Sequence, residues 1–302
     1  MKLVLYDDFN PGILKGDTVV DIASVVAHLE GGHGQHLMEG IIDSFGSLQP
    51  ELEKVAKTAR GLPLSEVRLR PPLPRPSKIL CCIGNYWEHM ERAPRPLNMF
   101  LKSPESIIGP GDTVELPEFQ AEVFHHEAEL GIVIKGPAKN ISESNYMKVV
   151  FGYTCFTDVS ARDDGRKTWR AGSFLGKSFD TFCPIGPCIV TVDEIRNPNA
   201  LGVKYWVNGQ LRHDYRTDDM EHRVPELVSF ATAVMTMNTG DLIACGTNHE
   251  GLGPLQDGDI GEVEIQGIGR MSINVSDPLK RSWDRGIYMG IDSTAHGAQR
   301  EH

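Results

Sequence analysis

The feature that most limits the possible folds of this chain is a series of short apolar runs bounded by Gly, Pro, Asn and Asp. These runs continue from residue 78 to residue 275 and have the length and composition of strands. Helical spacing is convincing only over residues 142–149 and 224–237 in this region, and a short helix is predicted over 85–92. Because strands dominate and do not alternate with helices, the pattern predicts an α+β, mostly β fold.

A proline-rich passage divides the chain in two. Four prolines between residues 71 and 76 exclude a helix or a central strand there, so we expect an extended linker and a domain boundary. The prediction is a small N-terminal α/β domain over residues 1–70, a catalytic domain over residues 71–287, and a loose polar tail over residues 288–302.

The N-terminal domain has its own predicted elements. Residues 3–8 and 18–23 have strand composition, and the sequence Asn10-Pro11-Gly12 between them predicts a turn. Apolar residues with helical spacing follow over residues 36–60.

The charge balance narrows the class of partner. The chain has 302 residues, and 30 Lys and Arg against 41 Asp and Glu give a formal net charge of −11. Such a surface repels phosphate backbones and anionic lipids, so we expect no nucleic-acid partner and no membrane partner. Asp7 and Asp8 interrupt the N-terminal apolar run, which argues against a secretory signal. The six cysteines form no CxxC pair, which favours reduced, buried thiols and a cytoplasmic protein.

Two glutamates alternate with apolar residues in the segment HHEAELGIVI, residues 125–134. On a strand, residues two apart face the same side, so Glu127 and Glu129 project together. Paired carboxylates repel each other unless a cation lies between them, and Mg²⁺, Mn²⁺ and Ca²⁺ prefer oxygen ligands. A solvated strand edge also explains paired acids, so this segment alone leaves both interpretations open.

A third acid strengthens the metal interpretation. Asp158 ends the apolar run VVFGYTCFTD, and a carboxylate at the end of a buried strand is costly unless it is paired. If Asp158 meets the two glutamates, three carboxylates form half of an octahedral shell and leave room for water and substrate. Arg162, four residues later, is predicted to steady a carboxylate or to bind the substrate.

A lysine close before a structured strand is the next candidate. Lys177 lies between Gly176 and Ser178, shortly before the sequence Pro-Ile-Gly-Pro. A lysine there can reach inward and bind an anion or an enolate oxygen. Taken alone, however, a surface lysine explains the same sequence.

Taken in order, these motifs resemble those of the fumarylacetoacetate hydrolase family over roughly residues 78–285. Single matches are weak, but the ordered series is specific. The matching motifs are Ile83-Gly84-Asn85-Tyr86 with His89, Phe100-Leu101-Lys102-Ser103-Pro104, Glu127-Ala128-Glu129-Leu130, Asp158-Val159-Ser160-Ala161-Arg162-Asp163, residues 176–182, Pro184-Ile185-Gly186-Pro187, Val207-Asn208-Gly209, Gly240-Asp241-Leu242-Ile243, Gly246-Thr247 and Gly258-Asp259.

The resemblance implies a mixed β-sandwich or roll catalytic domain, a homodimer, and Mg²⁺ or Mn²⁺ held by Glu127, Glu129 and Asp158, with Ca²⁺ as a further candidate. It implies that Lys177 and Thr247 contact a small oxo-acid substrate. It also implies a divalent-metal-dependent hydrolase that cleaves a C–C bond in an acylpyruvate or 1,3-diketo acid through a stabilised enolate.

Other members of the family support alternative activities. An oxaloacetate decarboxylase or tautomerase, or another lyase or isomerase of 2-oxo acids, needs no activated water, and a sugar-acid diketo hydrolase is also open. For hydrolysis, His89 is the candidate base that deprotonates the attacking water, because imidazole titrates near neutral pH. A surface histidine is the competing interpretation.

The chain departs from the family pattern around this base. Arg92 stands where hydrolytic members often have a glutamate, and Gly165 lies in a run that often has a glutamine. His249 and Glu250 follow Thr247 where the family often has a Gly-Val-Gly turn. In hydrolytic members the glutamate at the position of Arg92 can orient the histidine base. We therefore hypothesise that His249 and Glu250 replace this missing partner of His89 or serve a different proton transfer. A plain turn is the competing interpretation.

Two further readings are weaker. A non-catalytic metal-binding domain would need neither Lys177 nor His89. A zinc site would require His125 and His126 to act together, but neighbours on a strand point to opposite faces. The charged segment over residues 211–223 is expected to be a solvated loop rather than an interface.

Overall fold

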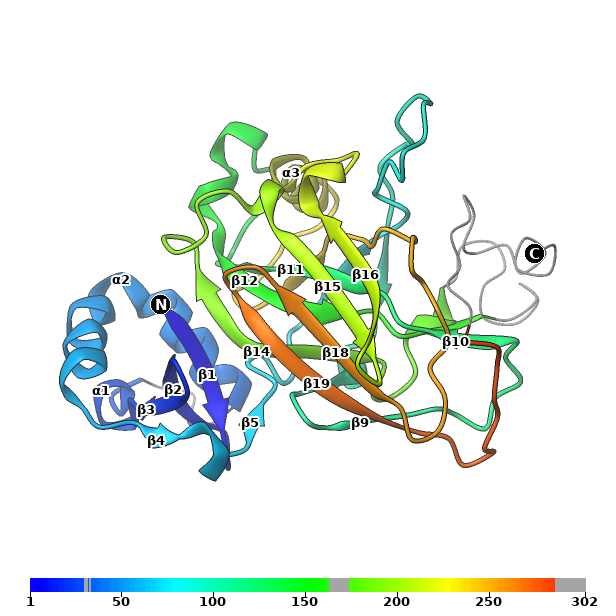
Figure 1. Ribbon diagram of the computed structural model, residues 1–302. Coiled ribbons are helices and arrows are strands. Elements are labelled where there is room, and N and C mark those ends of the chain that lie inside the picture. The colour runs from blue at the N-terminus through cyan, green and yellow to red at the C-terminus, as the bar shows by residue number, and fades with distance from the viewer. Residues whose placement is uncertain (30–31, 33, 163–173, 286–302) are drawn as a thin grey trace.

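One large sheet runs through the protein and links its N-terminal residues to its centre (Figure 1). The computed structural model describes residues 1–29, 32, 34–162 and 174–285, and in this part of the chain the sheet has 12 strands. They are β1 (Lys2–Tyr6), β2 (Asn10–Lys15), β3 (Thr18–Asp21), β4 (Leu62–Pro63), β5 (Leu69–Arg70), β6 (Ile79–Cys82), β7 (Met99–Lys102), β8 (Ile107–Ile108), β11 (Ala128–Ile134), β12 (Val150–Thr157), β14 (Cys183–Thr191) and β17 (Leu242–Ala244).

The strand order places β11 and β12 near the middle of this sheet. The order is β4-β3-β2-β1-β14-β12-β11-β17-β6-β7, with β5 beside β1 and β8 beside β14. The pairs of β17 with β6 and of β14 with β8 are parallel, whereas β11 and β12 are antiparallel. Strands in the middle of a sheet have no free edge, and all residues of β11 and β12 are buried. The central strands therefore give any side chain at their ends a fixed position.

A second, antiparallel-rich sheet packs over part of the first (Figure 1). Its order is β16-β15-β18-β19-β9, and a separate two-stranded sheet joins β10 to β13. These strands are β9 (Thr113–Glu115), β10 (Val123–His125), β13 (Ser160–Arg162), β15 (Gly202–Val207), β16 (Gln210–Arg216), β18 (Ile260–Ile265) and β19 (Gly269–Ser276).

Helices are few and short, except for one. The α-helices are α1 (Ala23–Val26), α2 (Gly34–Thr58) and α3 (Val224–Val234). The 3₁₀ helices in the described residues are η1 (Leu64–Glu66), η2 (Pro104–Ser106), η3 (Glu143–Lys148), η5 (Leu175–Lys177), η6 (Pro198–Ala200) and η7 (Thr217–Asp219). None of the helices among the described residues has the length and apolarity needed to cross a membrane.

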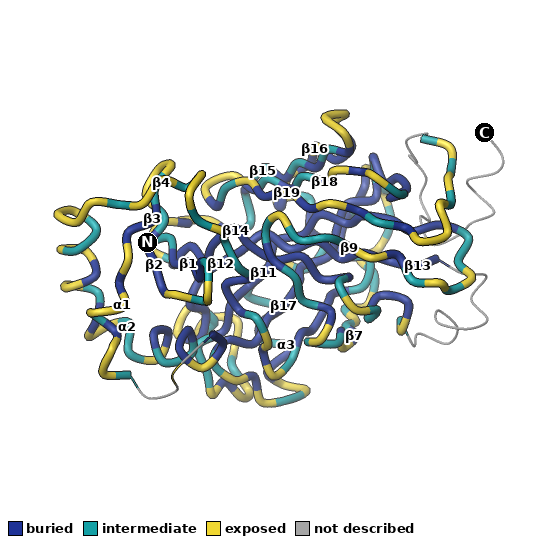
Figure 2. Tube along the Cα trace, turned by 90° about the horizontal axis from the view of Figure 1, so that it is seen from below, coloured by how far each residue is buried: buried dark blue, intermediate teal, exposed yellow. Residues whose placement is uncertain are grey.

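Two hydrophobic cores lie on opposite faces of the large sheet. Strand alternation separates them: Leu3 and Leu5 of β1 belong to the core beneath α2, whereas Val4 belongs to the core shared with α3 and the second sheet. The buried tube in Figure 2 runs continuously through the central strands, and exposure is concentrated in outer loops and helix surfaces. The mostly β prediction is therefore confirmed, with a sheet buried on both faces.

Several predicted elements are confirmed and others are wrong. The helices predicted over residues 36–60 and 224–237 correspond to α2 and α3. The helix predicted over 142–149 is only the 3₁₀ helix η3, because a six-residue segment gains too few hydrogen bonds to offset nucleation of an α-helix. Residues 85–92 contain no helix, and Glu88 and His89 adopt positive φ angles of 52° and 59°.

The predicted turn at residues 10–12 is also wrong. The turn lies at residues 7–9, where Asp7 and Phe9 have positive φ, and Asn10 begins β2. Gly12 serves close packing instead, since a Cβ at this position would lie 2.6 Å from Cγ1 of Val19. The glycine is thus required by the neighbouring strand rather than by a turn.

The proposed domain boundary lies in a segment without helix or strand, but the sheet is continuous across it. β1 pairs with β14 in the register Lys2↔Val190, so the N-terminal strands extend the sheet of the second region. The division at residues 70 and 71 stays a prediction. The expected tail, residues 288–302, lies outside the described residues.

Candidate functional site

Register between two central strands brings three carboxylates together. β11 pairs with β12 so that Ala128 lies opposite Thr157, and the N–H of Asp158 donates to the carbonyl of Glu127 at 2.9 Å. Asp158 therefore lies directly across from Glu127, and Glu129 lies two residues along on the same face. One carboxylate oxygen from each residue lies within 4.8 Å of the others. The sequence prediction of this cluster thus matches the geometry.

The three carboxylates are buried, and burial opposes ionisation of the two glutamates. The exposed fractions of Glu127, Glu129 and Asp158 are 5%, 1% and 1%. Burial, followed by the negative charges of Asp158 and Glu127, raises the pKa of Glu129 well above its ordinary value. Burial also disfavours ionisation of Glu127, but Lys177 and Arg162 outweigh it and lower the pKa of Glu127.

Lys177 lies directly against the carboxylates. Its Nζ donates to Oε2 of Glu127 at 2.7 Å, to Oδ2 of Asp158 at 2.7 Å and to Oγ of Ser160 at 2.6 Å. It stands at the end of η5, and only 4% of it is exposed. The surface-lysine interpretation is therefore wrong, because the side chain turns inward to the two acids.

A second buried lysine, Lys102, had no role assigned from the sequence. Its Nζ donates to Oδ1 of Asp158 at 2.8 Å and to the carbonyl of Lys177. Burial opposes the charge of Lys102, but Asp158 outweighs burial and raises the lysine's pKa. The available signal was its register: Phe100 and Lys102 lie two apart on β7, and both face inward.

Arg162 closes the other side of the cluster. Its Nη2 forms an ion pair with Oε1 of Glu127, and its Nε donates to Nδ1 of His125 at 3.2 Å. Arg162 is 2% exposed, which agrees with the predicted role of steadying a carboxylate. A contact between Arg162 and substrate stays a prediction. The Asp163–Arg166 run, including Gly165, lies outside the described residues.

The loop after β17 is anchored to the third carboxylate. The N–H of Gly246 donates to Oε2 of Glu129 at 2.7 Å. Thr247 follows and is 2% exposed, with its Oγ1 3.5 Å from the hydroxyl of Tyr215. Tyr215 in turn donates to the carbonyl of Ala128, between the two glutamates. Thr247 therefore lies beside the cluster, and the contact with substrate that the family resemblance implies stays a prediction.

Two histidine–glutamate pairs link this loop to residues 88 and 89. Nδ1 of His249 lies 2.5 Å from Oε1 of Glu88, and Nε2 of His89 lies 3.5 Å from Oε2 of Glu250. Glu250 therefore lies within ion-pair distance of His89, and the hypothesis that this segment supplies the partner of the base stays a prediction. The Glu88–His249 pair was not predicted, because the expected helix would have turned Glu88 away.

The structure also explains the arginine at position 92. Arg92 donates to both carboxylate oxygens of Glu221, and the N–H and Nε of Arg95 donate to the same group at 2.6 and 2.7 Å. Burial opposes ionisation of Glu221, but these hydrogen bonds outweigh it and lower its pKa to about 2. Both arginines also donate to the carbonyl of Tyr86. We call this arrangement, Arg92 and Arg95 on Glu221, the Glu221 clamp; it fastens the loop that carries Glu88 and His89.

Adjacent His125 and His126 diverge, as expected of neighbours on a strand. His125 accepts from Arg162, whereas Nδ1 of His126 lies 3.1 Å from Nε2 of His213 and its ring stacks on Tyr205. Within the described part of the chain, the carboxylate triad is the only group of three or more such ligands close enough to share a metal. The solvated-loop prediction for residues 211–223 is wrong at its start, because β16 buries Arg212 and His213.

The donor set fits a hard divalent cation. All three ligands are carboxylates, and Mg²⁺, Mn²⁺ and Ca²⁺ bind oxygen in preference to sulfur or nitrogen. Burial is the main cause of the raised pKa of Glu129, and the negative charges of Asp158 and Glu127 add to it, which leaves a local imbalance of charge. A divalent charge among these oxygens would remove that imbalance.

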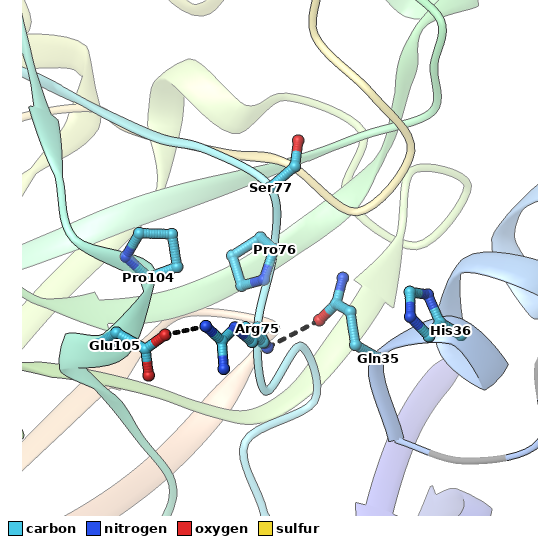
Figure 3. Close-up of a pocket in the computed structure, with 7 residues that line it drawn as sticks. All are labelled: Gln35, His36, Arg75, Pro76, Ser77, Pro104 and Glu105. Carbon is cyan, nitrogen blue, oxygen red and sulfur yellow. Dashed lines mark hydrogen bonds and ion pairs between the residues drawn. The ribbon is translucent and has the colours of Figure 1, made fainter.

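A separate hollow of about 450 Å³ lies away from this chemistry (Figure 3). The close-up shows Arg75 between two partners: its guanidinium forms an ion pair with Glu105, and its N–H donates to Oε1 of Gln35 at 2.9 Å. None of the carboxylate triad or its two lysines lines this hollow. We therefore place the functional site at the triad.

Comparison with known proteins gives a consistent result. The model of the fumarylacetoacetate (FAA) hydrolase C-terminal family matches residues 78–276. A maleylpyruvate hydrolase of Aquipseudomonas alcaligenes is 32% identical over 294 residues, which cover 91% of this chain and 99% of that protein. The oxaloacetate tautomerase YisK of Bacillus subtilis (strain 168) is 38% identical over 222 residues, which cover 69% and 73%.

Solved structures resemble the whole fold. The crystal structure of maleylpyruvate hydrolase from Sphingobium sp. SYK-6, in complex with manganese(II) ion and pyruvate, has a TM-score of 0.82 and 33% identity, and covers 92% of this chain and 99% of that chain. A 5-carboxymethyl-2-hydroxymuconate delta-isomerase from Mycobacterium smegmatis has a TM-score of 0.72 and 33% identity, with coverage of 92% and 99%.

Proposed function

Because this chain belongs to the fumarylacetoacetate hydrolase family, we propose that it is a divalent-metal-dependent hydrolase of a small acylpyruvate or related 1,3-diketo acid. The family relatives include hydrolases, tautomerases and isomerases, and what they share is an activity on small acids. The observation that carries the proposal is the buried triad of Glu127, Glu129 and Asp158 with the Lys177 ammonium against it.

In this proposal the triad holds one Mg²⁺ or Mn²⁺. The manganese(II) and pyruvate in the Sphingobium relative support both the metal and the oxo-acid half of the substrate. When bound, such a cation would withdraw electron density from the 2-oxo acid. It would stabilise the negative charge that develops on the 2-oxo oxygen as the bond between C3 and the distal carbonyl carbon breaks.

The surrounding residues supply orientation and further positive charge. Lys177 donates to two of the three carboxylates, and in this proposal it also contacts the 2-oxo group of the substrate. Arg162 holds Glu127 in one orientation, and Lys102 does the same for Asp158. Because these partners are almost entirely buried, water screens their charges little, and the carboxylates are held in fixed positions for the proposed metal.

A tautomerase or decarboxylase of oxaloacetate is the second candidate. The B. subtilis relative is an oxaloacetate tautomerase, and Arg92 stands where hydrolytic relatives are expected to have a glutamate that orients the base. Such a reaction needs the same enolate stabilisation but no attacking water. The earlier expectations of a homodimer and of a cytoplasmic location stay predictions.

The test is turnover of purified protein with Mg²⁺ or Mn²⁺ against a panel of acylpyruvates and oxaloacetate. Loss of enol absorbance is followed while pyruvate, the second acid and CO₂ are assayed, with Glu127→Ala as the metal-site variant. Metal-dependent formation of pyruvate plus a second acid, lost in the variant, supports the hydrolase. Tautomerisation or CO₂ release from oxaloacetate without cleavage of any acylpyruvate would replace it with the second candidate.

A further inference from the structure

The inner of the two histidine–glutamate pairs, His249 with Glu88, is buried and closely spaced. His249 is 8% exposed, and its Nδ1 lies 2.5 Å from Oε1 of Glu88. The same oxygen also accepts the backbone N–H of His249 at 3.0 Å. The carboxylate oxygen accepts both of these hydrogen bonds, which places the ring hydrogen on Nδ1 and leaves Nε2 able to accept one. Glu88 therefore fixes both the tautomer and the orientation of the imidazole.

The backbone around Glu88 is held in an uncommon conformation for this contact. Glu88 and His89 both lie in the left-handed region, with φ of 52° and 59°, which costs free energy for residues other than glycine. Such a conformation persists only where surrounding contacts enforce it. The Glu221 clamp supplies those contacts on one side, and the N–H of Glu88 donates to Oδ2 of Asp219 at 3.2 Å on the other.

The loop that carries His249 also contacts one of the carboxylates proposed to hold the metal. Gly246, three residues before His249, donates to Glu129, so the Cα of His249 lies within about 11 Å of the anchored Cα of Gly246. The loop thus joins the dyad to the site.

The outer pair lacks these properties. The His89 side chain is 83% exposed, and its Nε2 lies 3.5 Å from Glu250, beyond good hydrogen-bond distance. An exposed ion pair of this kind gains little free energy and fixes no tautomer. Of the two histidines, only His249 is both buried and oriented by a carboxylate.

We propose that His249 is the general base and acid of this enzyme and that Glu88 is its positioning residue, an assignment that rests on the proposed oxo-acid chemistry. His249 Nε2 takes a proton from water as the water oxygen forms a bond to the distal carbonyl carbon. The C–C bond then breaks, its electron pair passes to C3 of the pyruvate fragment, and the proton on Nε2 returns to C3. The products are one carboxylic acid and pyruvate, and the base is regenerated.

The experiment separates proton transfer from hydrolysis. Exchange of the C3 protons of pyruvate for deuterium in D₂O with Mg²⁺ is followed by NMR, and acetylpyruvate hydrolysis is assayed in parallel. We expect His249→Gln to lower both rates by about 10²-fold or more, and Glu88→Gln by about 10- to 100-fold. KM and Mn²⁺ affinity are expected to change by less than about threefold, because neither side chain is a metal ligand. His36→Gln, which breaks the exposed His36–Glu39 pair on α2, is the matched control.

A second readout does not depend on turnover or metal. In the metal-free protein, ¹H–¹⁵N NMR of the histidine rings is expected to show a strongly deshielded Nδ1 proton that Glu88→Gln removes. The same spectra establish that each variant is folded.

Each outcome decides the assignment. Rates within about threefold of wild type for His249→Gln, or a larger loss for His89→Gln than for His249→Gln, would overturn it while leaving the hydrolase proposal standing. Another outcome is a protein that exchanges the C3 protons only when His249 is present and yet cleaves no acylpyruvate. That result would support the role of His249 and Glu88 and contradict the hydrolase proposal. If wild-type protein catalyses neither reaction, both proposals are wrong.

Discussion

The carboxylate triad and the histidine–glutamate dyad face the same chemistry but are held in different ways. Glu127, Glu129 and Asp158 lie on or beside two central strands whose hydrogen-bond register places them opposite one another. Glu88 and His249 lie on loops, and their contact depends on a positive φ angle and on the Glu221 clamp. The rigid part of the site is therefore secured by backbone pairing, and the adjustable part by a few side chains.

The difference has consequences for function. A metal site tolerates little displacement of its ligands, and central strands provide that rigidity. A group that transfers protons must meet substrate, water and product in turn, and loop residues can adjust as a substrate enters. Disturbing the strands should therefore abolish the chemistry, whereas disturbing the loop should weaken it by degrees.

The largest effect is expected at the triad. Glu129→Gln removes one ligand charge at almost constant volume, and we expect turnover to fall by about 10³-fold or more as the metal is lost. Calorimetric titration with Mn²⁺ measures the affinity, and thermal unfolding establishes that the fold is intact. Retention of tight Mn²⁺ binding by this variant would show that the triad is not the metal site.

A smaller effect with two opposite components is expected at Lys177. Its ammonium lies at the carboxylates that the metal would use, so Lys177→Met should strengthen Mn²⁺ binding by about tenfold or more by removing a like charge. Turnover should nevertheless fall by about 10²-fold, since the second positive contact to the substrate is lost.

Calorimetry and steady-state kinetics on the same preparation of Lys177→Met separate these components. Lys57→Met, which removes an exposed lysine on α2, serves as the control. Weaker Mn²⁺ binding in Lys177→Met would contradict this account, because it would mean that the ammonium supports the metal rather than competing with it.

The strand residues and the loop residues of the site also differ in how far the sequence predicts them. The alternation Glu127–Ala128–Glu129 and the acid at the end of a buried strand indicate the triad, because a period of two is a local property of the chain. The inward direction of Lys102 follows the same rule, although no role was assigned to it. Strand-borne site residues were therefore within reach of sequence reasoning.

The two histidine–glutamate pairs on the loops could not be predicted in this way. Residues 85–92 have the composition of a helix, but the Glu221 clamp holds them in a turn, and Glu221 lies more than a hundred residues away. The pairing of residue 88 with residue 249 depends on that tertiary contact. The sequence indicated that His249 and Glu250 were unusual, and only the structure identifies Glu88 as the partner of His249.

The smallest effect is expected at the clamp itself. Glu221→Gln weakens the hydrogen bonds from Arg92 and Arg95, and we expect turnover to fall by about tenfold with Mn²⁺ affinity unchanged. Hydrogen–deuterium exchange measured by mass spectrometry should become faster in residues 86–95. Glu262→Gln, which removes a comparable contact to Arg270 on the second sheet, is the control. Equal exchange in wild type and variant would mean that the clamp does not hold the loop.

The most direct test of the central claim is anomalous diffraction from crystals grown with Mn²⁺ and pyruvate. The account predicts one strong manganese peak among Glu127, Glu129 and Asp158, at about 2.0–2.4 Å from one oxygen of each, with the pyruvate on the same ion. A peak at His125 or His126, or no peak at the triad while the protein remains active, would contradict it.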